Sequence, residues 1–271
     1  MLQKKILARR WIAGGILGLL PAGLFAQPRP SAAPPAPKTP ILISPRLHSV
    51  AAAMRQTHII PPWQAPKLIL LDQKHLWMAP FHLKARQLKM LPMMGALLTG
   101  LIVSDSSTAL LLKGSRSEIS NTRTASDYAM NSMLGVGAVL YFDGWLGHHL
   151  HRNQAGWHAL ESAANATIIG FVLKTAFQRE RPYQNAGDGR FWAGGSSFPS
   201  GHALAAWSIA ASLSRSYPHA TWLHWLAYGT AAAICILRVT AQHHFPGDVV
   251  AGGALGYGIG SSVTPVWSGQ P

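Results

Sequence analysis

Residues 221–260 read TWLHWLAYGTAAAICILRVTAQHHFPGDVVAGGALGYGIG and contain two apolar segments separated by a short polar stretch. The segments, at about 220–239 and 246–264, are rich in Ala, Gly and Leu and lack the apolar–polar alternation of a strand. Pro246 suits the first turn of a helix, because its missing N–H would have no partner there. The stretch therefore predicts two helices joined by a polar turn.

The second segment carries Gly252, Gly256 and Gly260 at intervals of four residues. Such a stripe lets another helix approach closely, which indicates a packing role. Four more apolar segments of helical length precede it, at about 91–112, 126–147, 155–178 and 200–216. They also lack strand-like alternation, so the sequence predicts an all-α bundle of about six helices.

The first 26 residues are typical of a signal peptide. A positive region holds Lys4, Lys5, Arg9 and Arg10, an apolar stretch follows from Trp11, and Ala26 stands at a plausible cleavage position. The alternative is an uncleaved N-terminal anchor. Under both interpretations we expect an exported protein, periplasmic or membrane-associated, with its site outside the cytoplasm.

The remaining chain divides into three parts. Residues 27–88 begin with a Pro/Ala tract that cannot bury a core and continue as a basic segment with further prolines. We expect a linker there, followed by irregular or partly helical pieces. The helical domain is predicted over residues 89–264, with a tail at 265–271.

The net charge of +14 is unevenly distributed along the 271 residues. Residues 1–90 hold 13 of the 23 Lys and Arg and a single acid, Asp72, whereas residues 91–271 carry a net charge of only +2. The helical domain is therefore not a basic nucleic-acid-binding surface, and no recognition motif is visible. The basic N-terminal part favours a membrane surface with anionic head groups as a partner.

Two relations to the membrane are open. The chain is 48% hydrophobic and only 12% charged, and small residues and Trp-rich segment ends suit both a soluble bundle and six membrane spans. Asp105, Glu161 and Asn165 lie within apolar segments, and such polar residues are costly in lipid. We favour a compact exported bundle that rests on a membrane. An integral membrane protein is the alternative.

Three motifs stand at the ends of predicted helices. KTAFQRERP (174–182) places Lys174 and Arg181 seven residues apart across a helix end. SSFPSGHALAAWSIA (196–210) offers Ser200 as a helix N-cap, with Gly201 and His202 in the first turn. Free backbone N–H groups at such a helix start bind anions, and Gly201 permits close approach.

The third motif, LRVTAQHHFPGDVV (237–250), follows Arg238 with a pair of histidines. His244 lies just before the next helix, and Asp248 lies four residues on, within reach of one ring nitrogen. His243 would point elsewhere. Together the motifs supply cations, two histidines, a helix N-terminus and an orienting carboxylate, which are the groups needed for phosphoryl transfer through a histidine.

At these motifs the chain resembles the type-2 phosphatidic acid phosphatase and vanadium haloperoxidase superfamily. The family pattern Lys-x6-Arg-Pro, Pro-Ser-Gly-His and Ser-Arg-x5-His-x3-Asp is met in order and register over about residues 90–264. One departure is Leu237, which stands where the family has a serine before the arginine. The missing hydroxyl affects rate or specificity more than reaction class.

The resemblance implies a helical bundle with the active site at helix ends. It implies His244 as a nucleophile that forms a phosphohistidine, Asp248 as the residue that orients it, and His202 as general acid. The phosphate ligands it implies are Lys174, Arg181, Ser200, Gly201 and Arg238. It implies no metal and no other cofactor.

The sequence therefore predicts a metal-independent phosphomonoesterase acting on lipid phosphates or other phosphoesters. A vanadium-dependent haloperoxidase is an alternative, because vanadate resembles the phosphoryl transition state. A non-enzymatic membrane or envelope protein that keeps the bundle as a scaffold is a second alternative, to which Leu237 gives some room.

Overall fold

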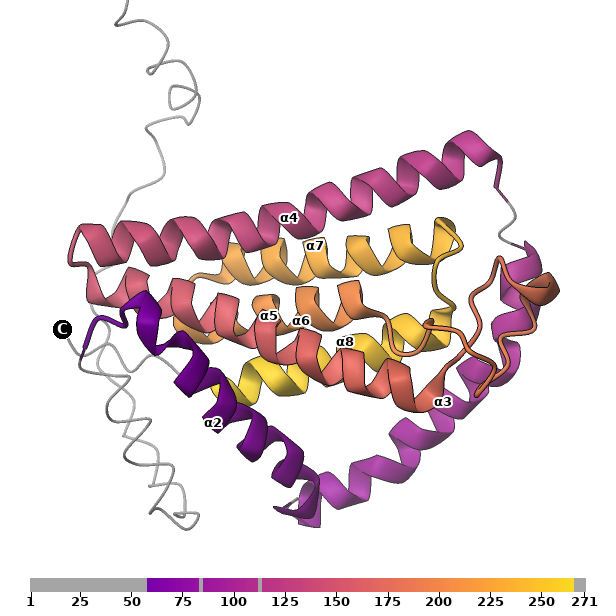
Figure 1. The fold of residues 1–271 in the computed structure, drawn as a ribbon, viewed down its shortest axis with the longest axis horizontal. Coiled ribbons are helices and arrows are strands. Elements are labelled where there is room, and N and C mark those ends of the chain that lie inside the picture. Colours follow the sequence, from indigo (N-terminus) through magenta and orange to yellow (C-terminus); the bar gives the residue numbers. More distant parts are fainter. Residues whose placement is uncertain (1–57, 83–84, 112–113, 266–271) are drawn as a thin grey trace, which may run out of the picture. The chain divides into compact units, whose positions relative to one another are not determined.

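The computed structural model describes residues 58–265 except 83–84 and 112–113. Within these ranges every regular element is a helix, which confirms the predicted all-α class (Figure 1). The elements are η1 (Pro62–Gln64), α2 (Ala65–Met78), η2 (Ala79–His82), α3 (Ala85–Leu111), α4 (Arg116–Leu146), α5 (Leu150–Phe177), η3 (Asn185–Gly187), α6 (Gly201–Ser216), α7 (Thr221–Thr240) and α8 (Pro246–Val263). The predicted signal peptide or anchor, the Pro/Ala tract and most of the tail lie outside the described residues.

Each predicted apolar segment corresponds to one helix, and the largest differences are at helix starts. The helix expected from residue 126 begins at Arg116, because Ser115 caps it. The Ser115 hydroxyl accepts from the backbone N–H of Glu118, and the Glu118 carboxylate accepts from the backbone N–H of Ser115. This reciprocal pair satisfies two N–H groups at the helix start, so the helix extends through polar residues beyond the apolar segment.

Within the segment expected to be irregular or partly helical, residues Ala65–Met78 form α2, which packs on α5. Pro66 lies in the first turn of this helix, where proline is tolerated, although the prolines of this segment favour irregular structure in the sequence. Gln73 donates from Nε2 to the Asn165 side-chain oxygen at 2.8 Å, and Asn165 donates to Asp72 at 3.3 Å. Buried amides need such partners, so the polar residues of α5 serve packing against α2.

Helix α6 is the most deeply buried element of the described bundle and contacts α5, α7 and α8. The glycine stripe of α8 faces its backbone. A Cβ at Gly252, Gly256 or Gly260 would lie 2.6, 2.1 or 2.2 Å from the carbonyl oxygens of Ser200, Leu204 and Ser208, respectively. These separations are too short for any side chain, and the stripe has the packing role predicted for it.

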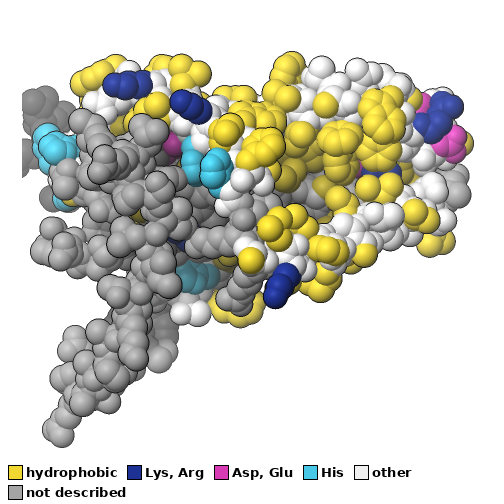
Figure 2. All heavy atoms as spheres, turned by 90° about the horizontal axis from the view of Figure 1, so that it is seen from below, with side chains coloured by type: hydrophobic (Ala, Val, Ile, Leu, Met, Phe, Trp, Pro, Cys, Tyr) yellow, Lys and Arg dark blue, Asp and Glu magenta, His cyan; other side chains and the backbone are white. Residues whose placement is uncertain are grey.

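The outer helices expose much apolar surface. By length and composition, residues Leu88–Ala109 of α3 and Thr221–Thr240 of α7 are suited to cross a membrane. Exposed large apolar side chains on these two helices include Leu88, Met93, Leu97, Val103, Trp222, Trp225 and Ile236. Figure 2 shows a face of the molecule on which hydrophobic side chains are widespread and charged groups are few. This surface suits a membrane partner.

Candidate active site

The three motifs meet at one end of the described bundle, where α5 and α7 end and α6 and α8 begin (Figure 1). Several contacts join the second and third motifs directly. The backbone N–H of Ser200 donates to the Asp248 carbonyl at 3.0 Å, and His244 Nδ1 lies 2.8 Å from the Ser197 carbonyl oxygen. The predicted location of the site at helix ends therefore agrees with the structure.

Helix α7 ends in a turn that separates the two adjacent histidines. The His243 N–H donates to the Arg238 carbonyl and the Gln242 N–H donates to the Val239 carbonyl, a pairing that closes a helix end with a left-handed residue. Gln242 is that residue, with φ of 55°. The chain then turns into α8 at Pro246, which leaves His244 buried and His243 half-buried.

His244 is held in one tautomer. Only 3% of the residue is exposed, and its Nδ1 must donate to the Ser197 carbonyl because a carbonyl oxygen only accepts. Burial lowers the His244 pKa to about 4, with Asp248 opposing the shift and the charges of Lys174 and Arg238 adding to it. At neutral pH the ring is therefore uncharged and Nε2 carries a free lone pair, as a nucleophile requires.

Asp248 supports His244 less directly than predicted. Its Oδ2 lies 3.7 Å from His244 Nδ1, longer than a hydrogen bond, whereas the Ser197 carbonyl is 2.8 Å away. The same carboxylate accepts from the Ser197 hydroxyl at 2.5 Å and from the Phe245 N–H at 2.9 Å, and so caps α8. Asp248 thus acts on His244, the predicted nucleophile, mainly through its negative charge and by fixing the Ser197 segment.

A buried cation that the sequence reasoning missed balances Asp248. Arg179 is 1% exposed and donates from Nη1 to Asp248 at 2.7 Å, and the same nitrogen lies 2.9 Å from Asp105 Oδ2 of α3. Its guanidinium also lies over the Phe191 and Phe245 rings, 4.8 and 4.4 Å from their centroids. Burial alone would raise the Asp248 pKa, but His244 and Arg179 outweigh it, so that this pKa is lowered and the carboxylate stays ionised.

Ser200 and Gly201 form the start of α6, as predicted. The Ser200 hydroxyl is buried and accepts from the Ala203 N–H at 3.5 Å, so it caps the helix. A Cβ at Gly201 would lie 3.7 Å from Lys174 Cε, which places the Gly201 backbone beside a cation. A helix N-terminus next to a lysine favours an anion. The buried cap makes the Ser200 hydroxyl a less direct phosphate ligand than the resemblance implies.

His202 is paired with an acid that the three motifs do not contain. Its Nε2 lies 3.0 Å from Asp127 Oδ1 of α4, and Arg238 Nη1 donates to the same oxygen at 3.1 Å. Burial and the charge of Arg238 lower the His202 pKa, whereas Asp127 opposes this shift. Asp127 therefore links the predicted general acid to a predicted phosphate ligand.

Arg238 Nη1 also donates to the hydroxyl of Ser126 on α4 at 3.2 Å. Its buried Nε has no hydrogen-bond partner among the residues that the structure describes. A buried donor without a partner costs free energy unless a ligand accepts its hydrogen bond. This geometry suits a group that binds an anion, and it gives Arg238 a serine contact that Leu237 cannot provide.

Lys174 and Arg181 meet at Ser196. Lys174 Nζ donates to the Ser196 carbonyl at 2.6 Å, and Arg181 Nη2 donates to the Ser196 hydroxyl at 3.1 Å. Burial, followed by the charge of Arg181, lowers the Lys174 pKa to about 8, so that most of the lysine is charged at neutral pH. Two cations held this close to one another favour binding of an anion.

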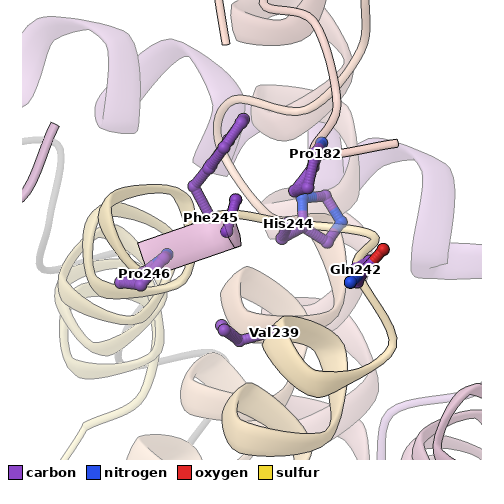
Figure 3. Close-up of a pocket in the computed structure, with 7 residues that line it drawn as sticks. Pro182, Val239, Gln242, His244, Phe245 and Pro246 are labelled. Atoms are coloured by element: carbon purple, nitrogen blue, oxygen red, sulfur yellow. The ribbon is translucent and has the colours of Figure 1, made fainter. Parts of the chain in front are cut away.

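A small hollow lies beside His244 (Figure 3). Its lining is mostly apolar and consists of Ala109, Pro182, Val239, Gln242, His244, Phe245 and Pro246. The cations of the motifs do not line it, so it is adjacent to the anion-binding groups rather than among them. In the described part of the chain, no group of three or more His, Cys, Asp or Glu side chains could hold a metal ion.

Residues 155–269 match the family model described as the PAP2 superfamily. This segment contains every site residue predicted from the motifs and confirms the resemblance on which they rest. Asp105 and Asp127, which the structure adds to the site, lie before it.

One solved structure to which the chain is similar is the first transmembrane PAP2-type phosphatidylglycerolphosphate phosphatase from Bacillus subtilis. Sequence identity is 22%, the TM-score is 0.43, and the alignment covers 74% of this chain and 94% of that one. No curated protein matches the chain in a sequence comparison.

Proposed function

We propose that this chain, whose residues 155–269 match the PAP2 superfamily, is a phosphomonoesterase that hydrolyses lipid phosphates or other phosphoesters through a phosphohistidine intermediate. The observation that carries the proposal is the state of His244. Its Nδ1 is occupied by the Ser197 carbonyl and its pKa is about 4, so Nε2 is unprotonated at neutral pH. Nucleophilic catalysis by histidine requires this form.

In the first step, His244 Nε2 attacks phosphorus as the bond from phosphorus to the leaving oxygen breaks. Lys174, Arg181 and Arg238 stabilise the charge on the phosphoryl oxygens, together with the backbone N–H of Gly201. Protonated His202 transfers its proton to the leaving oxygen, so the product alcohol departs neutral. The products of this step are the alcohol and a phosphohistidine.

In the second step, water attacks the phosphorus of the phosphohistidine. His202, now neutral, accepts a proton from this water, and the bond from phosphorus to Nε2 breaks. Inorganic phosphate leaves, His244 returns to its neutral form and His202 is again protonated. These protein cations supply the positive charge that the transferring group needs, and we therefore propose that no metal takes part.

We also propose that the enzyme works outside the cytoplasm and at a membrane surface. The motif-bearing end of the bundle lies near α3, since Asp105 of that helix contacts Arg179 and Gly247. Leu88–Ala109 of α3 is one of the two segments suited to a membrane. A membrane partner on α3 would bring lipid phosphates close to the site. The N-terminal positive region and apolar stretch support export.

The test measures phosphate release in EDTA from a panel of phosphatidic acid, isoprenoid pyrophosphate and p-nitrophenyl phosphate. We expect wild-type protein to release phosphate and His244→Ala to release none above background. Rapid quenching of the wild type in alkali should trap an acid-labile phosphohistidine that His244→Ala lacks. Folded wild-type protein that releases phosphate from no member of the panel would contradict the proposal.

A further inference from the structure

His243, the neighbour of the proposed nucleophile, contacts a proposed phosphate ligand. Its Nδ1 lies 2.9 Å from Arg181 Nη1. The ring also meets the Tyr183 ring edge-to-face, with centroids 5.8 Å apart and an interplanar angle of 70°. Arg181 and Tyr183 belong to the segment after α5, whereas His243 follows α7, so the contact joins two loops that are distant in sequence.

The direction of the hydrogen bond follows from chemistry. A guanidinium has no lone pair and stays protonated, so Arg181 donates and His243 Nδ1 accepts. His243 must therefore be neutral, with its proton on Nε2. Burial and then the charges of Arg238, Arg181 and Arg123 lower the His243 pKa to about 4, against the opposing charge of Asp127. The ring is thus an acceptor at neutral pH.

Arg181 is held from two sides by these contacts. Nη1 donates to His243, and Nη2 donates to the Ser196 hydroxyl at 3.1 Å. Each terminal nitrogen carries two N–H groups, so the described contacts leave one on each, as well as Nε–H, for an anion. Fixing the plane of a long side chain before the ligand arrives reduces the entropy lost on binding.

The backbone places His243 for this contact. The left-handed residue Gln242 and the bond from the His243 N–H to the Arg238 carbonyl set its position directly after α7. The same turn presents His244 to Ser197. Two consecutive histidines therefore have different partners, one a carbonyl that orients the nucleophile and the other a guanidinium.

We propose that His243 is a positioning residue that accepts a hydrogen bond at Nδ1 from Arg181 and thereby orients this guanidinium toward the phosphoryl group. The inference rests on the proposed function, which supplies the phosphoryl group. Its effect can be measured in the binding of inorganic phosphate as well as in turnover. His243 does not contact the reacting atoms in this role. It acts through Arg181.

The experiment compares His243→Ala, His243→Asn and His243→Gln at pH 7. Asparagine places an amide oxygen near the position of Nδ1, whereas glutamine reaches toward that of Nε2. We expect His243→Ala and His243→Gln to weaken binding of inorganic phosphate by calorimetry about fivefold, the equivalent of one hydrogen bond, and to raise KM similarly. His243→Asn should restore most of both values. His219→Ala, an exposed histidine between α6 and α7, is the control and should change neither.

A double-mutant cycle separates positioning from a general effect on folding. In an Arg181→Ala background, His243→Ala should have no further effect on phosphate binding, because the group it orients is absent. Equal effects of His243→Ala in both backgrounds would overturn the inference, as would binding in His243→Ala that matches wild type. If the wild type hydrolyses phosphoesters but the cycle shows no coupling between His243 and Arg181, the inference about His243 is wrong and the proposed function stands. Failure of the wild type both to bind phosphate and to release it would overturn the proposed function as well.

Discussion

The two sides of the candidate site differ in how they hold their histidine. His244, between α7 and α8, is 3% exposed and contacts the Ser197 carbonyl. Its neighbour Asp248 is buried in turn against Arg179. The His202 side chain on α6 is 31% exposed, and its partner Asp127 on α4 is 44% exposed. A nucleophile must keep one tautomer and one direction, whereas a general acid must exchange a proton with each turnover. The buried side suits the first task and the open side suits the second.

The largest effect should come from removing His244. We expect His244→Ala to lower kcat on the order of 10⁴-fold with every substrate, because no covalent intermediate can form. Activity of His244→Ala within tenfold of wild type would show that another group is the nucleophile. Steady-state rates on p-nitrophenyl phosphate and a lipid phosphate provide the measurement.

Removing Arg179 from the buried side of the site should destabilise the fold. Arg179→Met would leave Asp105 and Asp248 buried without their cation, which costs about 3–5 kcal/mol. Chemical denaturation measures this loss in the free energy of unfolding. The matched control is Arg152→Met, which removes an exposed ion pair with Asp143 and should cost less than about 1 kcal/mol. Equal losses of unfolding free energy in the two variants would show that the contacts of Arg179 with Asp105 and Asp248 contribute no more than an exposed ion pair.

On the open side, the effect of removing His202 should depend on the leaving group of the substrate. His202→Ala is expected to lower kcat/KM about 10²-fold for an alkyl phosphate, whose alkoxide must be protonated as it departs. For p-nitrophenyl phosphate, whose leaving group needs little protonation, the decrease should be much smaller. Phosphohistidine should also accumulate with this substrate, because the second step loses its base. The same decrease for both substrates would indicate that His202 binds phosphate rather than donating a proton.

The smallest expected effect is a shift in pH dependence on removing Asp127. The charge of Asp127 and its hydrogen bond raise the His202 pKa against burial and Arg238. In Asp127→Asn that pKa falls further, so the protonated acid is lost at a lower pH and the basic limb of kcat/KM moves to lower pH. Activity at pH 7.5 should fall several-fold and activity at pH 5 should change little. If the basic limb of kcat/KM lies at the same pH in Asp127→Asn as in wild type, Asp127 does not influence the His202 pKa.

Local sequence is sufficient to predict the groups within the motifs, because each motif covers a helix end or the turn between two helices. The spacing from Lys174 to Arg181 and from His244 to Asp248 is short. Pro182 directly follows the first pair, and Pro246-Gly247 lies within the second. The six apolar segments predicted the positions of α3 to α8 because their composition is uniform. Helix α2 is harder to predict, since prolines lie directly before it and in its first turn, and its contacts depend on polar groups of α5.

The groups that the sequence reasoning missed depend on helices meeting in space. Asp127 and its partner His202 are 75 residues apart, and no local pattern connects them. Asp105 did give a signal, because an acid within an apolar segment needs a partner, but the partner was not visible from the segment alone. Arg179 lies between Lys174 and Arg181 in the first motif, and nothing in the local sequence indicates that it is buried. His243 was interpreted as pointing elsewhere, and the structure gives it a contact with Arg181.

The glycine stripe of α8 has a consequence for the distance between the two histidines. Where Gly252 and Gly256 meet the carbonyls of Ser200 and Leu204, the gap between α6 and α8 is set by main chain against main chain. Side chains in the rest of the core can change in volume without widening that gap. The spacing of the proposed acid and the proposed nucleophile is thereby fixed by the backbones of α6 and α8 rather than by the volumes of core side chains.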